Sequence, residues 1–374
     1  MESKRTHIYY LDYLRLFAAA AVVYMHTAAA GLRGNVGLGW HGMNLVTSLA
    51  FTAVPLFFMI SGYLLLTDEK TLDPAVLLRR RLPRLVIPLA GWTVVATMWD
   101  CVSARDVSFV FWGQRLLSGL YGPVQVPYWF MYTLIAVYVL SPLLYGGVQA
   151  LGRSGRRYLL ALIALVSLRG LLLALLPDEA DRYLGVDVLV KLQALGGYLL
   201  LFLLGWLLGT TERRFSTIGL IAAAVLTWAV ICIGTWRLTV RSGSYNAAFQ
   251  NQSAGPEVLL ASCLFLLAKQ TPARERTWLR SVVPLLFPTY LMHAVLLNMF
   301  YAVGIRPVRF VSVVGATVLN LVICYLTLKT VATMKPICYL ATGMTYEKAC
   351  ASCNWVYTAR RFREKYQTKT GGDT

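Results

Sequence analysis

Charged residues are scarce in this sequence. Only 14% of its 374 residues are Asp, Glu, Lys or Arg, while 57% are hydrophobic and the mean hydropathy is +0.60. Soluble domains carry about a quarter charged residues, so this composition excludes an ordinary soluble protein. Several apolar runs approach or exceed the roughly 20 residues that a helix needs to cross a bilayer. These runs are continuous rather than alternating, so we predict membrane-spanning helices and not a barrel.

Acidic residues are fewer than basic ones, at 17 against 35, and the formal net charge is +18. The Lys and Arg residues form short clusters between the apolar runs and do not follow one folded face. Attraction to anionic lipid, with a bias toward the cytoplasmic side, explains this distribution. The sequence therefore predicts contact with membrane lipid and no nucleic-acid partner.

A disulfide framework and a metal site are not expected from the seven cysteines. Four of them lie in or beside apolar runs, where cysteine behaves as a small hydrophobic residue. Cys338, Cys350 and Cys353 fall in the C-terminal tail, and no neighbouring histidine completes a zinc-binding set with them. The sequence also lacks the HExxH, Walker, GxSxG and dinucleotide-binding motifs. We therefore expect reduced thiols, no bound metal and none of those familiar mechanisms.

About ten apolar segments are predicted to cross the membrane as one bundle. They lie at 8–30, 44–66, 85–101, 128–147, 158–176, 194–210, 216–236, 255–269, 282–303 and 309–334. The N-terminus, the tail and the connections on their side carry 23 Lys and Arg residues, against 9 in the opposite connections. Both termini are therefore predicted in the cytoplasm. The predicted fold is an all-α membrane protein, with residues 1–334 as one membrane domain and residues 335–374 as a basic cytoplasmic tail, helical around 358–367.

Charges inside the first predicted span are candidate functional groups, because charge within a bilayer is energetically expensive. This span carries Asp12, Arg15 and His26. Arg15 and His26 are eleven residues apart. That separation is three helical turns plus about 20°, so the two side chains share a face and lie about 16 Å apart along the axis. The stripe could link the two sides of the membrane. Spacing alone equally allows Arg15 to reach lipid phosphates and His26 to bond a neighbouring helix.

Four arginines cluster before the third predicted span, at Arg79, Arg80, Arg81 and Arg84. Planar guanidinium groups bind phosphate groups in a bidentate manner, and the phosphates of coenzyme A would suit this cluster. On this pattern alone, an anchor that touches anionic lipid is the favoured interpretation.

Other candidate residues lie in the remaining spans. His293 follows Pro284 and Pro288, and prolines in a span free backbone carbonyls and kink the helix. With His26 it is one of two histidines predicted within the membrane. It could form part of a site or simply bridge helices.

Weaker signals come from small and aromatic residues. Ser61 belongs to a small-residue segment, Phe57–Tyr63, for which close helix packing is the default interpretation. Trp129 belongs to an aromatic cluster that suits a membrane-interface belt better than a sugar-stacking platform. Asp187 and Glu257 lie near outer span ends, where they could face a substrate.

Taken in order, these residues resemble the membrane-bound acyltransferase-3 family. The resemblance covers about residues 8–330 and departs at Met292, where an aromatic residue is common. The matching segments are Leu11–Arg15 with His26, Pro55–Leu64, Arg81 with Arg84, Tyr128–Tyr132 followed by Tyr138, Ser141 and Pro142, and Tyr290–His293.

The resemblance implies an enzyme, a membrane O-acyltransferase of the stand-alone bacterial branch in the inner membrane. Its donor would be cytoplasmic acyl-CoA, most simply acetyl-CoA, and its acceptor a hydroxyl of a cell-surface glycan or a lipid-linked precursor. The implied catalytic residues are Arg15, His26 and His293. The implied acyl-CoA-binding residues are Arg79, Arg80, Arg81 and Arg84, and those lining the acceptor site or cavity are Asp12, Ser61, Trp129 and Tyr290.

Two other functions use the same features. A polysaccharide exporter would also need intramembrane charges, but transporters often show inverted repeats with paired broken helices, and the sequence has no such symmetry. A sensor would bind acyl-CoA without turnover. The complete set of Arg15, His26, Arg81 and Arg84 argues against a sensor.

Overall fold

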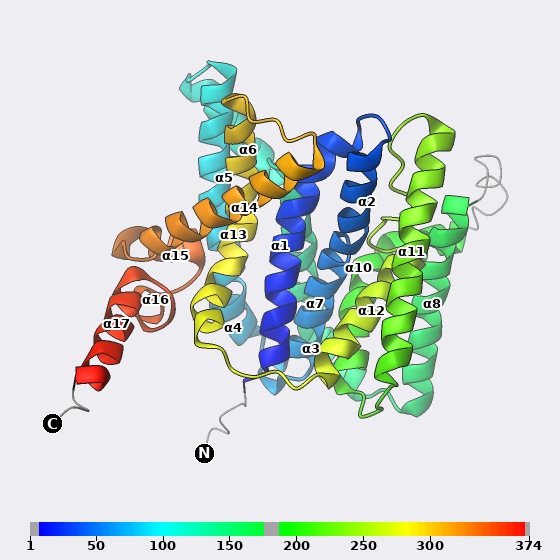
Figure 1. The fold of residues 1–374 in the computed structure, drawn as a ribbon. Coiled ribbons are helices and arrows are strands. Elements are labelled where there is room, and N and C mark those ends of the chain that lie inside the picture. Colours follow the sequence, from blue (N-terminus) through cyan, green and yellow to red (C-terminus); the bar gives the residue numbers. More distant parts are fainter. Residues whose placement is uncertain (1–6, 176–186, 371–374) are drawn as a thin grey trace. The chain divides into compact units, whose positions relative to one another are not determined.

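The computed structural model describes residues 7–175 and 187–370, and its regular elements are all helices over those residues (Figure 1). Seven stretches of this described chain are long and apolar enough to cross a membrane, namely Tyr9–Leu32, Leu38–Leu66, Pro74–Ala104, Phe109–Gln149, Thr217–Ser242, Thr277–Ala302 and Phe310–Val331. Each overlaps one of the predicted spans, so the polytopic helical fold is confirmed.

The other three predicted spans, 158–176, 194–210 and 255–269, correspond to helices α8 (Arg153–Leu175), α10 (Asp187–Thr210) and α12 (Gly255–Gln270). Residue 176 lies outside the described residues. These helices are not among the seven stretches. The total of about ten spans and the side on which the termini lie stay predictions.

Contacts within the chain divide it into two units, which are described separately. Unit 1 comprises residues 1–74, 136–274 and 307–316, and unit 2 comprises residues 75–135, 275–306 and 317–374. Three boundaries fall inside helices, namely the short α4 (Pro74–Val76), α7 (Trp129–Gln149) and α14 (Phe310–Val331).

Unit 1 is built around an antiparallel pair, α1 and α2, which lie side by side in Figure 1. Helix α3 packs against α10, and α11 packs against α12. The elements not yet bounded are α1 (Tyr9–Leu32), α2 (Leu38–Ala50), α3 (Ala53–Leu66), the short 3-10 helix η1 (Glu69–Leu72) and α11 (Thr217–Ser242).

The predicted second span, 44–66, lies within the apolar stretch Leu38–Leu66. This stretch consists of two helices, which separate at Phe51 and Thr52. Pro55 explains the break: its ring would clash with the carbonyl four residues earlier, at Phe51, and it has no N–H to donate. The predicted connection before this span is also shorter than expected, since α2 already begins at Leu38.

Helices α3 and α10 approach each other through glycines. A Cβ atom at Gly62 would stand 1.8 Å from the carbonyl oxygen of Phe202, and one at Gly205 would stand 2.0 Å from that of Met59. Only glycine allows backbones to come so close. The packing role expected for the small-residue segment around Ser61 is therefore confirmed.

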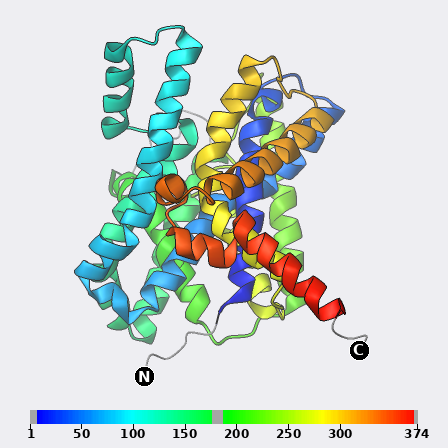
Figure 2. The same ribbon diagram turned by 90° about the vertical axis from the view of Figure 1, so that its left-hand side faces the viewer.

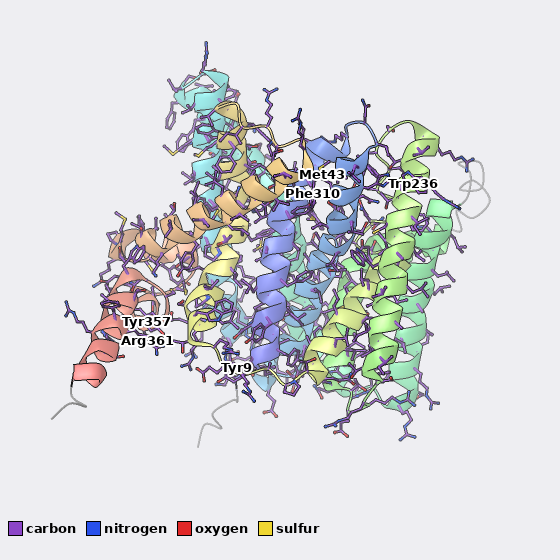
Figure 3. The ribbon with its side chains drawn as sticks, in the orientation of Figure 1. Tyr9, Met43, Trp236, Phe310, Tyr357 and Arg361 are labelled. Carbon is purple, nitrogen blue, oxygen red and sulfur yellow. The ribbon has the colours of Figure 1, made fainter. Side chains whose placement is uncertain are left out.

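Large side chains pack against the C-terminal end of α1, where the chain turns toward α2. Met43 and Phe310 lie together there in Figure 3. A Cβ at Gly31 would stand 2.6 Å from the Met43 sulfur, and one at Gly42 would stand 3.1 Å from the Phe310 ring. Trp40 also donates a 2.9 Å hydrogen bond to the last carbonyl of α1. These contacts fix the helix segment that carries His26.

Unit 2 is organised around α5, which contacts α6, α13 and α15. The predicted connection 102–127 is not an open loop, because it contains α6. The elements of this unit, beyond parts of α7 and α14, are α4 (Pro74–Val76, which begins at the unit boundary), the π-helix η2 (Leu77–Arg81), α5 (Pro83–Ala104), α6 (Phe109–Tyr121), the 3-10 helix η3 (Val126–Tyr128), α13 (Thr277–Ala302), α15 (Lys335–Thr342), α16 (Tyr346–Ser352) and α17 (Trp355–Thr370).

The C-terminal segment is more ordered than the sequence indicated. Only one helix was expected, near residues 358–367, whereas three helices follow α14 (Figure 2). The first of them, α15, packs against α5. The position of α15 on α5 depends on tertiary contacts, which helical periodicity in the sequence does not predict.

Candidate functional site

The beginning of α1 holds a charged cluster. Asp12 is only 3% exposed. Its carboxylate accepts a 3.0 Å hydrogen bond from Nη1 of Arg15 and lies 2.5 Å from Nε2 of His7. A buried carboxylate requires such partners, because an unpaired charge away from water is strongly unfavourable. Asp12 therefore orients the Arg15 guanidinium, while its predicted contact with an acceptor stays a prediction.

His7 was not predicted as part of this cluster. Its position just before the first span was evident from the sequence, but its approach to Asp12 depends on how the chain enters α1.

His26 lies on the same uninterrupted helix as Arg15. Their shared face is therefore consistent with the helical spacing of eleven residues. The side chain of Arg15 is 30% exposed, and His26 is half-buried. Both side chains are thus more accessible than the Asp12 carboxylate.

His293 is fully buried in α13. Its Nδ1 lies 2.6 Å from the backbone carbonyl oxygen of Tyr290. Because a carbonyl can only accept, Nδ1 carries the ring proton and Nε2 is the basic nitrogen of the neutral imidazole. Asn320 on α14 donates a 3.1 Å hydrogen bond to the backbone carbonyl of His293. The ring is therefore held in one tautomer within a supported segment.

Tyr290 has a structural role beside His293. Its hydroxyl donates to the carbonyl of Pro127, and the hydroxyl of Tyr128 donates a 2.8 Å hydrogen bond to the carbonyl of Leu291. These reciprocal bonds join the segment before α7 to α13. The aromatic cluster thus supports the helix turn that carries His293.

Trp129 and Ser61 are both half-buried. The Trp129 ring meets Phe130 edge-on at a centroid distance of 6.3 Å, and Phe130 in turn meets Tyr290 at 5.4 Å. Their predicted places along an acceptor path stay predictions.

The arginine segment has an unusual backbone. Residues Leu77–Arg81 form a π-helical turn, closed by a 2.9 Å bond from the Leu82 N–H to the Leu77 carbonyl. Such turns are rare and occur often at functional sites. Arg79, Arg80 and Arg84 are exposed and Arg81 is half-buried. The four guanidinium groups therefore belong to one short segment at the beginning of α5.

The predicted site residues fall in both units. The structure joins Asp12 with Arg15, joins Tyr290 with His293 and groups the four arginines. Unit 1 holds Asp12, Arg15, His26 and Ser61, and unit 2 holds Arg79, Arg80, Arg81, Arg84, Trp129, Tyr290 and His293.

A buried polar cluster in unit 1 was missed by the sequence interpretation. Gln250 is fully buried, and its Nε2 donates hydrogen bonds of 3.0 Å to Asn44 and 2.9 Å to Ser48. Asn44 donates a 2.9 Å bond to the carbonyl of Cys232. The segment between α11 and α12 therefore turns back into the bundle, where its irregular backbone is shielded by protein, as membrane interiors require. The i, i+4 spacing of Asn44 and Ser48 was the one signal available.

Glu257 lies close to this cluster and is fully buried. Neither of its carboxyl oxygens has a hydrogen-bond partner within residues 7–175 and 187–370. Tyr245 donates a hydrogen bond to Gln250. Burial and then the nearby Glu257 charge raise the pKa of Tyr245, while Arg33 opposes this rise. Glu257, Tyr245 and Arg33 are thus electrostatic neighbours. The side chain of Asp187, the other weak candidate, lies outside the described residues.

An apolar cavity in unit 1 is separate from these residues. It has a volume of about 580 Å³ and lies among α8, α10, α11 and α12. Its lining includes Ile163, Leu204, Leu226 and Leu259. It contains none of the predicted site residues, so it is not part of the candidate site.

Comparison with known families supports the resemblance. A family model described as an acyltransferase domain, acyltransferase-3, matches residues 8–329. The matched range includes all the predicted site residues and ends before α15. No curated protein and no solved structure matches the chain significantly.

Proposed function

Because this chain belongs to the acyltransferase-3 family and is a membrane acyltransferase, we propose that it transfers an acyl group from acyl-CoA to a hydroxyl of a glycan. The family match over residues 8–329 carries the proposal, since it spans both intramembrane histidines and the arginine segment. We propose acetyl as the acyl group, a cell-surface glycan or its lipid-linked precursor as the acceptor, and the inner membrane of a bacterium as the location.

His26 is the proposed general base. It accepts the proton of the acceptor hydroxyl while the hydroxyl oxygen attacks the thioester carbonyl carbon. The tetrahedral intermediate then collapses, the C–S bond breaks, and the proton passes from His26 to the departing CoA sulfur. Histidine suits this duty because its ordinary pKa is close to physiological pH. A covalent acyl-His26 relay is an alternative route to the same products.

Arg15 and the arginine segment are the proposed donor-binding groups. Their guanidinium groups complement the pyrophosphate and 3′-phosphate of coenzyme A. Asp12 acts through Arg15 by holding the guanidinium in one orientation, so it is a positioning residue.

His293 is assigned a proton-accepting role. With Nδ1–H bonded to the Tyr290 carbonyl, a neutral ring accepts at Nε2 and cannot donate there. Stabilisation of the tetrahedral oxyanion through Nε2 would require the imidazolium form. The tautomer therefore favours a base or a partner for a substrate hydroxyl over an oxyanion donor.

Replacement of His26 tests the function. Surface glycans from cells with and without the protein would be compared by mass spectrometry, and we expect one sugar to lose an acyl group when the protein is absent. His26→Ala should lower acyl transfer by about 10²- to 10⁴-fold, the usual contribution of a general base.

His41→Ala is the matched control, because His41 is an exposed histidine on α2 and should retain transfer. Full transfer by a well-folded His26→Ala protein would contradict the mechanism. If His26→Ala instead removed the glycan from the cell surface, the exporter alternative would replace the enzyme.

A further inference from the structure

The C-terminal segment beyond the family match is fitted to α5. Trp92 on α5 donates a 3.0 Å hydrogen bond to the carbonyl of Ala341 on α15. A Cβ atom at Gly91 would stand 2.7 Å from the carbonyl oxygen of Leu340. Backbone contact at this distance is possible only at glycine. Helices α5 and α15 therefore form a close, specific interface (Figures 1 and 2).

The turn after α15 reaches the arginine segment itself. Gly343 ends this helix with a φ of +69°, a left-handed conformation that favours glycine. A Cβ there would stand 2.4 Å from the carbonyl oxygen of Arg84 and 3.1 Å from Cγ of Pro88. The backbone that carries Arg84 is thus in contact with the C-terminal segment.

The same segment is also fixed at its far end. Asn354 donates a 3.1 Å hydrogen bond to the carbonyl of Ala332, and the indole of Trp355 donates a 3.0 Å bond to Thr330. The ammonium of Lys329 lies 4.1 Å from the Trp355 ring centroid, a cation–π distance. Helix α17 continues from there, with Tyr357 and Arg361 one turn apart in Figure 3. The segment between α14 and α17 is therefore held at both ends.

Lys348 lies on α16, five residues after Gly343, whose turn meets the backbone of Arg84. Desolvation by the surrounding chain and then the positive charge of Arg84 lower the pKa of Lys348. Neither side chain forms an ion pair with an acidic residue in the described part of the chain. The adjacent acid, Glu347, interacts instead with Lys335. Two neighbouring cations without a counter-charge create a positive potential that attracts an anion.

We propose that Arg84 and Lys348, brought together by the docking of the C-terminal segment on α5, form a binding site for a phosphate group of the acyl-CoA donor. This inference rests on the proposed function, since it names a subsite for the donor. Both residues keep solvent-accessible surface, although packing around Lys348 removes part of its hydration, so a soluble phosphate ester reaches them. Arg84 provides the planar donor and Lys348 a compact point charge. The C-terminal segment is then a part of the donor site that the family match does not include.

Direct binding of CoA tests the site. The full chain in nanodiscs of zwitterionic lipid would be titrated calorimetrically with CoA. We expect Lys348→Ala to weaken CoA binding about tenfold or more, because hydrogen bonds to charged groups are among the stronger ones. Lys335→Ala is the matched control, since it removes an exposed lysine from the same segment and should leave the affinity unchanged. Titration with 3′-dephospho-CoA identifies which phosphate is bound.

A glycine pair tests the docking separately. Gly343 and Gly304 both adopt positive φ in unit 2, but nothing lies within 4 Å of a Cβ at Gly304. Both Gly→Ala variants therefore carry the same kind of backbone strain. Only the new Cβ atom of Gly343→Ala collides with the carbonyl oxygen of Arg84. We expect Gly343→Ala, but not Gly304→Ala, to weaken CoA binding while the helical circular dichroism signal is retained. Lys348→Ala remains decisive if Gly343→Ala does not fold.

The outcomes separate this inference from the proposed function. If the unaltered protein binds CoA and Lys348→Ala binds it equally well, the phosphate site is wrong and the acyltransferase proposal survives. If the unaltered protein binds neither CoA nor acetyl-CoA, the proposed donor fails, and the inference with it. A lipid headgroup would be the true ligand if Lys348→Ala left CoA binding intact and weakened only the binding of vesicles containing phosphatidylglycerol.

Discussion

Two sets of polar groups, one in each unit, differ in their surroundings. In unit 1, Asp12 and Gln250 are buried and hydrogen-bonded to named protein partners. In unit 2, Arg84 and Lys348 are solvent-accessible cations on α5 and on the C-terminal segment that docks against it. Buried polar groups depend on their partners for stability, whereas exposed charges contribute little to it. The comparison predicts that substitutions in the first set change folding and that those in the second change ligand binding.

Gln250→Ala should produce the largest loss of stability. It leaves Asn44, Ser48 and Tyr245 without a shared partner in the bundle interior. Each unsatisfied buried group costs about 1–3 kcal/mol, so we expect the free energy of unfolding to fall by about 2–3 kcal/mol or more. Thermal unfolding of the purified protein measures this. Ser244→Ala, at an exposed position of the same connection, is the control and should change little.

CoA binding by the folded fraction of Gln250→Ala should be unchanged. If this variant unfolds no earlier than Ser244→Ala, the cluster contributes nothing to stability and the contrast between the two sets of groups is lost.

Glu257→Met should have a smaller effect of opposite sign. The substitution removes a buried carboxyl group whose oxygens have no hydrogen-bond partner in the described part of the chain. Apolar replacement of such a group is neutral or favourable, so we expect the protein to gain about 1 kcal/mol. Glu212→Met, at an exposed position of unit 1, is the control. A strong loss of stability would reveal that the carboxyl group has a partner.

Glu257→Met also separates stability from function. Groups that are unfavourable for folding are commonly kept because a site needs them. If Glu257 serves the acceptor, the stabilised variant should transfer acyl groups more slowly while its affinity for CoA remains the same. Steady-state kinetics with varied acceptor and varied donor distinguishes these two parameters.

A change in salt concentration should have the smallest effect. It should change the CoA affinity that depends on the exposed cations of unit 2, and not the stability that depends on the buried groups of unit 1. Exposed charges are screened at moderate ionic strength, whereas buried pairs are screened much less. We therefore expect CoA affinity to fall a few-fold between low and physiological salt, while the unfolding temperature barely changes. Equal sensitivity of both quantities would show that the two sets of charges do not differ in exposure.

Local patterns in the sequence predicted part of this arrangement. Apolar length and helical spacing identified α1 and placed Arg15 and His26 on it, because both depend only on neighbouring residues. The grouping of Arg79, Arg80, Arg81 and Arg84 is local in the same sense. Pro55 also held a local signal for the break between α2 and α3, which the span prediction did not use.

Long-range contacts explain what the sequence interpretation missed. Gln250 is polar and lies in a connection, so its burial follows only from the side chains of α2 that receive it. The docking of α15 depends on Gly91, Gly343 and Trp92 meeting across more than two hundred residues of chain. The partnership of His7 with Asp12 likewise depends on the path of the chain into α1.

The π-helical turn at Leu77–Arg81 has a consequence for how the arginines are presented. A turn closed by an i→i+5 bond holds one residue more than an α-helical turn. Exchange of that bond for an i→i+4 bond would shift the register by one residue, which corresponds to a rotation of about 100° around the helix axis. Arg79 and Arg80 could thus be re-aimed by a single change of backbone bonding while α5 keeps its place. The extra residue of the π-helical turn would therefore allow these exposed arginines to change direction without a movement of α5.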